Sequence, residues 1–168
     1  MDAPHIMILG VGNLLLTDEG VGIHVVKALE EDFTFSQNVS IYDGGVLGIN
    51  LLGIISEADH LVVVDAVRNG GTPGDLYRIE GDDVPRRILA KNSLHEVDLL
   101  EALTLCQALD REPKTVIIGV EPQDIDTVDI EPSPPIRERT RDLLDMVLEE
   151  ITRLGGHYSR KECESPCA

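Results

Sequence analysis

Short apolar runs without polar interruption recur along this chain and indicate strands of a buried sheet. Residues 6–9, 61–64 and 115–120 do not alternate between apolar and polar side chains, as expected of strands that are covered on both faces. Residues 39–42 and 75–80 predict two further strands, and the second of these is expected at a sheet edge or in a hairpin.

Apolar residues at helical spacing fill the segments between these strands. Ser93 and Glu96 fit a capping box, in which each side chain bonds to a backbone amide at the start of a helix. Gly48 and Gly53 weaken another predicted helix, because glycine disfavours helical backbone. Helices are predicted at about residues 19–32, 47–58, 93–109 and 134–155, with a short helical turn near 82–89.

Strands that alternate with helices predict an α/β sandwich with a mainly parallel sheet of about five strands. The length fits a single domain with its own hydrophobic core. We expect this domain to span residues 1–156, followed by a mobile tail at 157–168 that lacks periodicity. The turn-rich segment 68–74 and the acidic, proline-rich segment 121–135 are expected to be surface loops.

The charge balance restricts the partners of this protein. Its 14 basic and 31 acidic residues give a formal net charge of −17, which would repel nucleic acid and anionic membranes. Metal ions and basic peptide segments remain compatible with that charge. No secretory signal is evident, and no apolar run approaches the about 20 residues that cross a bilayer. An odd number of cysteines favours a reducing cytoplasm over a disulfide framework; they are Cys106, Cys163 and Cys167.

Acidic residues follow the first three predicted strands. Asp18 and Glu19 come after the first strand, Asp43 ends the second and Asp65 ends the third. In open parallel sheets, ligands bind outside the carboxyl ends of the strands. Three loops are therefore expected to bring carboxylates to one edge of the sheet, which makes that edge the candidate site.

A dinucleotide site is one interpretation of the glycines in the first loop. Gly10 and Gly12 match the start of a GxGxxG fingerprint, but Leu15 occupies the third glycine position. Asp18 and Glu19 would also repel a pyrophosphate at the start of the following helix. The sequence therefore disfavours nucleotide binding, and it also lacks the GxSxG, HExxH and P-loop motifs.

A metal site is the second interpretation. Glu19, Asp65 and one histidine would form a mixed nitrogen and oxygen set that suits a divalent transition metal. His95 is the best placed histidine, because it falls in the first turn of a predicted helix, where the helix dipole disfavours its charged form. The other histidines are expected at the opposite end of the sheet, on a polar helix face or in the tail; they are His5, His60, His24 and His157.

Each of these residues also has an ordinary structural interpretation. Glu19 could serve only the helix dipole, and His95 could be an exposed residue of a first helical turn. Asp65 could be a turn or cap residue, and Asp43, which precedes two glycines, could form a turn. Cys106 lies on an apolar helix face and is expected in the core.

Five sequence blocks resemble the [NiFe]-hydrogenase maturation endopeptidases. The first and most specific is GVGNLLLTDEGVG at residues 10–22. It is followed, in the order seen in the family, by DGG at 43–45, DHLVVVDA at 59–66, SLH at 93–95 and GVEP at 119–122. The resemblance extends over roughly residues 6–154.

The resemblance implies a twisted sheet between two helical layers, in agreement with the pattern above. It implies an endopeptidase that removes a C-terminal extension from the nickel-loaded precursor of a hydrogenase large subunit. Glu19, Asp65 and His95 match the family's metal-binding positions, and the nickel they engage would be carried by the substrate. Asp43 is a tentative catalytic residue that would position substrate or assist proton transfer. Other divalent metals are expected to fit the same positions.

These expectations leave one competing function, a non-catalytic metal- or nucleotide-binding α/β module. The expected partner is the large-subunit precursor, the expected location is the cytoplasm, and neither nucleic acid nor membrane is expected as a partner. The loop 68–74 and the acidic segment 121–131 are where selection between substrates could lie, because binding specificity is often carried by loops.

Overall fold

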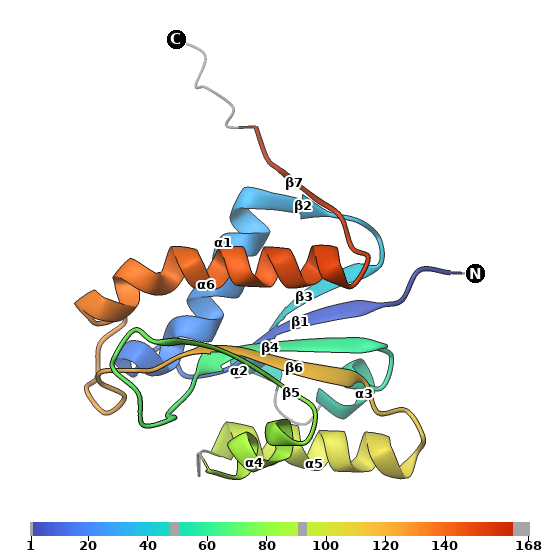
Figure 1. Cartoon of the computed structure of the whole chain (residues 1–168), viewed down its shortest axis with the longest axis horizontal. Helices are drawn as coiled ribbons and strands as arrows, with labels where there is room; N and C mark the ends of the chain where they lie inside the picture. Colours follow the sequence, from blue (N-terminus) through green and yellow to red (C-terminus); the bar gives the residue numbers. More distant parts are fainter. Residues whose placement is uncertain (1, 48–50, 91–93, 163–168) are drawn as a thin grey trace.

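The computed structural model describes residues 2–47, 51–90 and 94–162, without the side chains of 46–47, 88–90 and 94–98 (Figure 1). A five-stranded sheet lies at its centre, in the order β3-β1-β4-β6-β5. Four of these strands are parallel, and β5 runs antiparallel to β6 at one edge. The strands are β1 (Ile6–Gly10), β3 (Val39–Asp43), β4 (His60–Ala66), β5 (Leu76–Glu80) and β6 (Lys114–Val120).

Helices cover both faces of this sheet, which confirms the predicted three-layer architecture. Figure 1 shows α1 and α6 on one side of the sheet and α4 and α5 on the other. A short 3-10 helix, η1 (Thr17–Gly20), connects β1 to α1. The helices are α1 (Val21–Asp32), α2 (Gly44–Leu47), α3 (Leu51–Ile55), α4 (Asp83–Ala90), α5 (Leu94–Ala108) and α6 (Pro134–Arg153).

Alternate side chains of each central strand enter two separate hydrophobic cores. Val62 and Val64 of β4 pack with α1 and α6, whereas Leu61 and Val63 pack with α3 and α5. All four side chains are buried. This two-sided burial explains why the strands are continuously apolar, since neither face meets water.

A second, two-stranded sheet was not predicted. Phe33–Phe35 form β2, which pairs antiparallel with β7 at Tyr158–Arg160. Phe33 also packs edge-to-face against Tyr158, with 5.6 Å between ring centroids. Part of the segment expected to be a mobile tail is thus a strand that returns to the body of the protein. Three-residue strands are too short to show a period in the sequence.

Two predicted helices differ from the structure. Of the helix expected at about 47–58, the described residues contain α3 at Leu51–Ile55, and Leu47 is the last residue of α2. The helix expected from Glu19 begins instead at Val21, because η1 precedes it. Ser93 of the expected capping box lies outside the described residues. None of the described helices is long and apolar enough to span a membrane.

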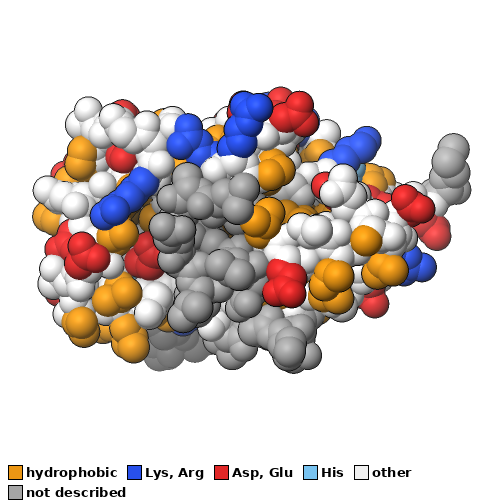
Figure 2. All heavy atoms as spheres, turned by 90° about the horizontal axis from the view of Figure 1, so that it is seen from below, with side chains coloured by type: hydrophobic (Ala, Val, Ile, Leu, Met, Phe, Trp, Pro, Cys, Tyr) orange, Lys and Arg blue, Asp and Glu red, His pale blue; other side chains and the backbone are white. Residues whose placement is uncertain are grey.

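Hydrophobic side chains are also present on the surface. Figure 2 shows them scattered among charged groups, with hydrophobic and acidic side chains next to one another at the left end of the view. The exposed large hydrophobic residues in the described part of the chain are Leu15, Leu105, Leu109, Val128, Ile130 and Tyr158.

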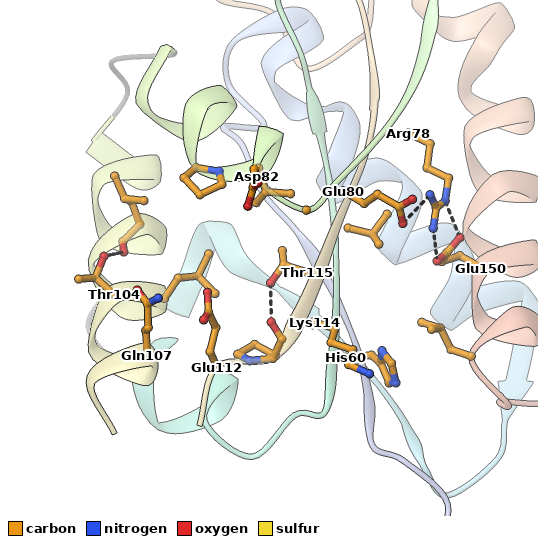
Figure 3. A pocket seen from close by; sticks show the side chains of 18 of the residues that line it. His60, Arg78, Glu80, Asp82, Thr104, Gln107, Glu112, Lys114, Thr115 and Glu150 are labelled. Atoms are coloured by element: carbon orange, nitrogen blue, oxygen red, sulfur yellow. Dashed lines mark hydrogen bonds and ion pairs between the residues drawn. The ribbon is translucent and has the colours of Figure 1, made fainter. Parts of the chain in front are cut away.

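A buried ion pair ties the edge of the sheet to α6. Arg78 of β5 donates hydrogen bonds from Nε and Nη2 to the two carboxylate oxygens of Glu150, each at 2.9 Å (Figure 3). Glu80 lies 2.9 Å from the remaining guanidinium nitrogen. The hydrogen bonds from Arg78 hold the pKa of the Glu150 carboxyl below its ordinary value of 4.5, against the effect of burial.

This pair lines a cleft of about 970 Å³ at the amino ends of β4 and β6. His60 and Lys114, the first residues of those two strands, also line it (Figure 3). The cleft therefore lies at the opposite end of the sheet from the predicted site.

We predict that Arg78→Ala lowers the free energy of unfolding by about 3 kcal/mol at pH 7, because it leaves the Glu150 carboxylate buried without its main partner. Since folding lowers the pKa of Glu150, the pair's stabilisation is complete above about pH 4.5 and is lost as the pH falls through the lower, folded-state value. Urea denaturation at several pH values measures both effects.

Arg139→Ala is the matched control. It breaks an ion pair with Asp142 in which both side chains are about half exposed, and such pairs contribute about 0–1 kcal/mol. Equal destabilisation by Arg78→Ala and Arg139→Ala would contradict a stabilising role for the Arg78–Glu150 pair. So would a difference in unfolding free energy between the two variants that becomes larger as the pH falls.

Candidate functional site

The predicted site residues lie where the parallel strands end. Asp43 is the last residue of β3, and Asp65 is the penultimate residue of β4. Glu19 lies in η1, which packs against β4. In the parallel register, Gly10 of β1 pairs with Asp43 on one side and with Val64 on the other. The structure therefore brings three of the predicted loops to one edge of the sheet.

Glycines in the first loop permit this close approach. Gly12 adopts φ +135°, and a Cβ there would overlap the carbonyl group of Glu19. A Cβ at Gly22 would overlap the carbonyl oxygen of Val64. The amide of Asn13 donates to the same Glu19 carbonyl oxygen at 3.1 Å. These glycines hold Glu19 against the end of β4, which explains them without a bound phosphate.

Glu19 and Asp65 are both buried, with 7% and 6% of their surfaces exposed. The Oδ1 atom of Asp65 accepts a hydrogen bond from the amide of Ala66 at 2.8 Å. Because side chains alternate along a strand, Asp65 belongs to the same face as Leu61 and Val63, the face that α5 covers. Two buried carboxylates at one edge of the sheet form an environment that favours a cation.

His95 is the second residue of α5. Since α5 leads to the amino end of β6, its own start lies toward the carboxyl ends of the parallel strands (Figure 1). The side chain of His95 is outside the description. No three His, Cys, Asp or Glu side chains within the described part are grouped to hold a metal ion. The set of Glu19, Asp65 and His95 therefore stays a prediction.

His5 and His60 lie at the amino end of the sheet, as predicted, whereas His24 lies on α1 near this edge. His5 contacts the carbonyl of Glu57 and the hydroxyl of Ser40, before β1 begins. His60 is the first residue of β4, at the amino end. His24 is half-buried on α1, with Nε2 3.1 Å from the carbonyl oxygen of a loop residue.

Asp43 has the turn-forming geometry expected of it. Its Oδ1 atom accepts a hydrogen bond from the amide of Gly45 at 3.0 Å. The side chain is half-buried. Since β1 lies between β3 and β4, Asp43 and Asp65 are two strands apart, or about 10 Å across the sheet. A catalytic role for Asp43 stays a prediction.

Asp18 has a role that the sequence interpretation missed. Its carboxylate is fully buried and accepts hydrogen bonds from the amides of Gln123, Asp124 and Ser133 at 2.7–2.8 Å. The Ser133 hydroxyl donates a fourth, at 2.8 Å. Asp18 thereby fastens the loop between β6 and α6 onto η1. These donors come 105 residues or more after Asp18, so no local sequence pattern could reveal them.

Further hydrogen bonds join the same two segments. The amide of Thr17 donates to the carbonyl of Asp129 at 2.8 Å, and its hydroxyl donates to the carbonyl of Thr127 at 2.7 Å. Thr17 has φ +30°, which is unusual for a residue with a branched side chain. The loop therefore holds the backbone next to Glu19 in a conformation that it would seldom adopt alone.

Glu121 holds the loop 68–74 in place by accepting hydrogen bonds from its backbone amides, as Asp18 does for the loop between β6 and α6. One of its carboxylate oxygens accepts hydrogen bonds from the Asn69 amide and the Tyr77 hydroxyl, both at 2.8 Å. Burial favours the neutral acid, but these bonds and those from the amides of Gly71 and Gly70 lower the pKa of Glu121. Burial and the same hydrogen bond raise the pKa of Tyr77 to about 12.

The cysteines do not contribute to this edge in the described structure. Cys106 is fully buried in the core, as predicted, and burial raises the pKa of its thiol. Cys163 and Cys167 lie outside the described residues.

Comparison with known proteins identifies relatives along nearly the whole chain. The model of the hydrogenase maturation protease family matches residues 23–150. The hydrogenase expression/formation protein HupD of Thiocapsa roseopersicina is 42% identical over 161 residues, which are 95% of this chain and 73% of that protein. The hydrogenase 2 maturation protease of Escherichia coli is 34% identical over 152 residues, covering 89% and 92% of the two chains.

The fold has close structural relatives as well. The hydrogenase maturating endopeptidase HybD from E. coli superposes with a TM-score of 0.87 at 31% identity, over 94% of this chain and 98% of that one. The predicted resemblance and the α/β sandwich are thus both confirmed.

We predict that Asp18→Asn lowers the free energy of unfolding by about 3 kcal/mol. The side-chain nitrogen of asparagine cannot accept a hydrogen bond, so at least one of the backbone amides that donate to Asp18 would lose its partner. Cleavage by an added protease within the loop 121–133 is expected to accelerate with it. Urea denaturation and limited proteolysis measure the two effects. Asp126→Asn is the control, since Asp126 is an exposed carboxylate of the same loop. Wild-type stability and proteolysis in Asp18→Asn would contradict the role given to Asp18.

Proposed function

The chain belongs to the hydrogenase maturation protease family and is a peptidase, and from this premise we propose that it cleaves the precursor of a [NiFe]-hydrogenase large subunit. The proposed reaction removes a C-terminal extension from the nickel-loaded precursor. The observation that carries the proposal is the pair of buried carboxylates, Glu19 and Asp65, at the edge of the sheet where α5 begins.

We propose that the nickel of the precursor is recognised by Glu19, Asp65 and His95. Two carboxylates and an imidazole form a donor set that suits a divalent transition metal. The placement of the two carboxylates supports this role, because Glu19 lies in η1, which packs against β4, the strand that carries Asp65. The alternation of β4 gives further support, since it turns Asp65 toward the face covered by the helix that carries His95.

The nickel of the substrate would fix the position of the scissile peptide relative to this edge. A metal ion in that position can polarise the scissile carbonyl or a water molecule. In the hydrolysis, the water oxygen adds to the carbonyl carbon, the C–N bond breaks and the leaving nitrogen takes a proton. Asp43, about 10 Å from Asp65, is proposed to position the substrate or to assist that proton transfer. The cytoplasm is the proposed location of the reaction.

The competing function, a non-catalytic metal- or nucleotide-binding module, loses its main support. The glycines that suggested a nucleotide, Gly10 and Gly12, lie against neighbouring backbone. A Cβ at Gly10 would overlap the carbonyl oxygen of Gly22, and a Cβ at Gly12 would overlap that of Glu19. The match to a family of proteases also favours catalysis over binding alone.

We predict that Glu19→Gln, Asp65→Asn and His95→Ala each reduce cleavage of a nickel-loaded precursor by about 100-fold or more, because loss of a positioning contact displaces the scissile bond. The measurement is the rate of appearance of the shortened large subunit by mass spectrometry. Glu31→Gln, which changes an exposed acid at the other end of α1, is the control and should retain the wild-type rate. Wild-type rates in all three site variants would reject the assignment.

A further inference from the structure

Three exposed hydrophobic residues lie on two joined segments near the proposed site. Leu15 is 61% exposed, Val128 is 79% exposed and Ile130 is 64% exposed. They belong to two segments that are joined by hydrogen bonds, since Leu16 bridges to Val128 and Asp129. The amide of Asp129 also donates to the carbonyl of Leu15 at 3.1 Å. We call these three residues the apolar patch.

Hydrogen bonds hold the backbone segments that carry the apolar patch. The amide of Asp18 donates to the carbonyl of Asp124 at 3.0 Å, next to the four bonds that its carboxylate accepts. His24 of α1 approaches the carbonyl oxygen of Ile130 at 3.1 Å. These bonds keep the segment that bears Val128 and Ile130 next to the segment that bears Leu15. A group of neighbouring exposed apolar residues can mark an interaction site.

Acidic side chains surround the apolar patch. Asp126, Asp129 and Glu131 are exposed in the same loop. The sequence has no lysine or arginine in residues 10–22 or 121–136, the two stretches that bear the patch, and the next residue, Arg137, pairs with Glu131 at 3.4 Å. The charge therefore selects for a cationic partner.

The apolar patch is continuous with the proposed catalytic edge. Leu15 and Glu19 belong to the same loop between β1 and α1, and Asp18 fastens that loop to the segment bearing Val128 and Ile130. The patch and Glu19 therefore lie on the same pair of joined segments.

We infer that the apolar patch docks the precursor itself, through an apolar stretch that carries basic residues and lies close to the scissile bond. This inference rests on the proposed function and adds to it the chemistry of the recognised segment. The patch contributes binding, and Glu19, Asp65 and His95 engage the nickel. Removal of patch side chains should therefore weaken binding without changing the chemical step.

The test compares Leu15→Ser and Val128→Ser with Leu109→Ser in steady-state cleavage of a purified nickel-loaded precursor. Leu109 is a matched control, because it is 62% exposed and follows α5 at the amino end of the sheet. We expect KM to rise on the order of tenfold for each patch variant, as one buried hydrophobic side chain contributes that much to affinity, with kcat unchanged. The control should keep the wild-type KM and kcat.

Salt tests the basic component of the partner. The wild-type KM should rise with sodium chloride, and Asp126→Asn combined with Asp129→Asn, two exposed acids of the loop, should reduce that dependence. A wild-type KM that is independent of salt would contradict a basic partner segment.

The outcomes separate this inference from the proposed function. Wild-type cleavage with an unchanged KM in the patch variants would overturn the docking surface and leave the function intact. Absence of any cleavage by the wild type would contradict both. A wild-type dimer that Leu15→Ser dissociates, with KM unchanged, would assign the patch to a second copy of this chain and overturn the inference.

Discussion

The buried carboxylate of Asp18 accepts hydrogen bonds from Gln123, Asp124 and Ser133, and these bonds join two segments that are remote in sequence. One segment leads from β1 into α1 and carries Glu19. The other connects β6 to α6 and bears most of the exposed apolar patch. Together with the bonds from Thr17 to the carbonyls of Asp129 and Thr127, the bonds to Asp18 hold the loop between β6 and α6 against η1. The position of the candidate site therefore depends on a residue that is itself fully buried.

Neighbouring acids at this edge have different roles because their surroundings differ. Asp18 is surrounded by protein donors and is structural, as is Glu121, whose bonds shape the loop 68–74. Glu19 and Asp65 are buried at the ends of the strands and are proposed to meet a metal ion carried by the substrate. An acidic protein thus uses some carboxylates to build its loops and others to attract its partner. The net charge of −17 suits a cationic partner.

The sequence predicted the central sheet because its strands are buried on both faces and are continuously apolar. It did not predict β2 and β7, whose pairing depends on tertiary contacts such as that between Phe33 and Tyr158. The location of Glu19 and Asp65 at one edge followed from the rule for parallel sheets. The role of Asp18 could not follow from any local pattern, since its partners become neighbours only in the folded chain.

The central claim is that the buried carboxylates at the carboxyl edge of the sheet act on a precursor through the nickel which that precursor carries. The most direct measurement incubates the protein with matched large-subunit precursors, with and without inserted nickel, and determines the masses of the products. Release of one C-terminal peptide from the nickel-loaded precursor alone is the predicted result. Equal release from the nickel-free precursor would contradict the claim, because cleavage would then not depend on the metal.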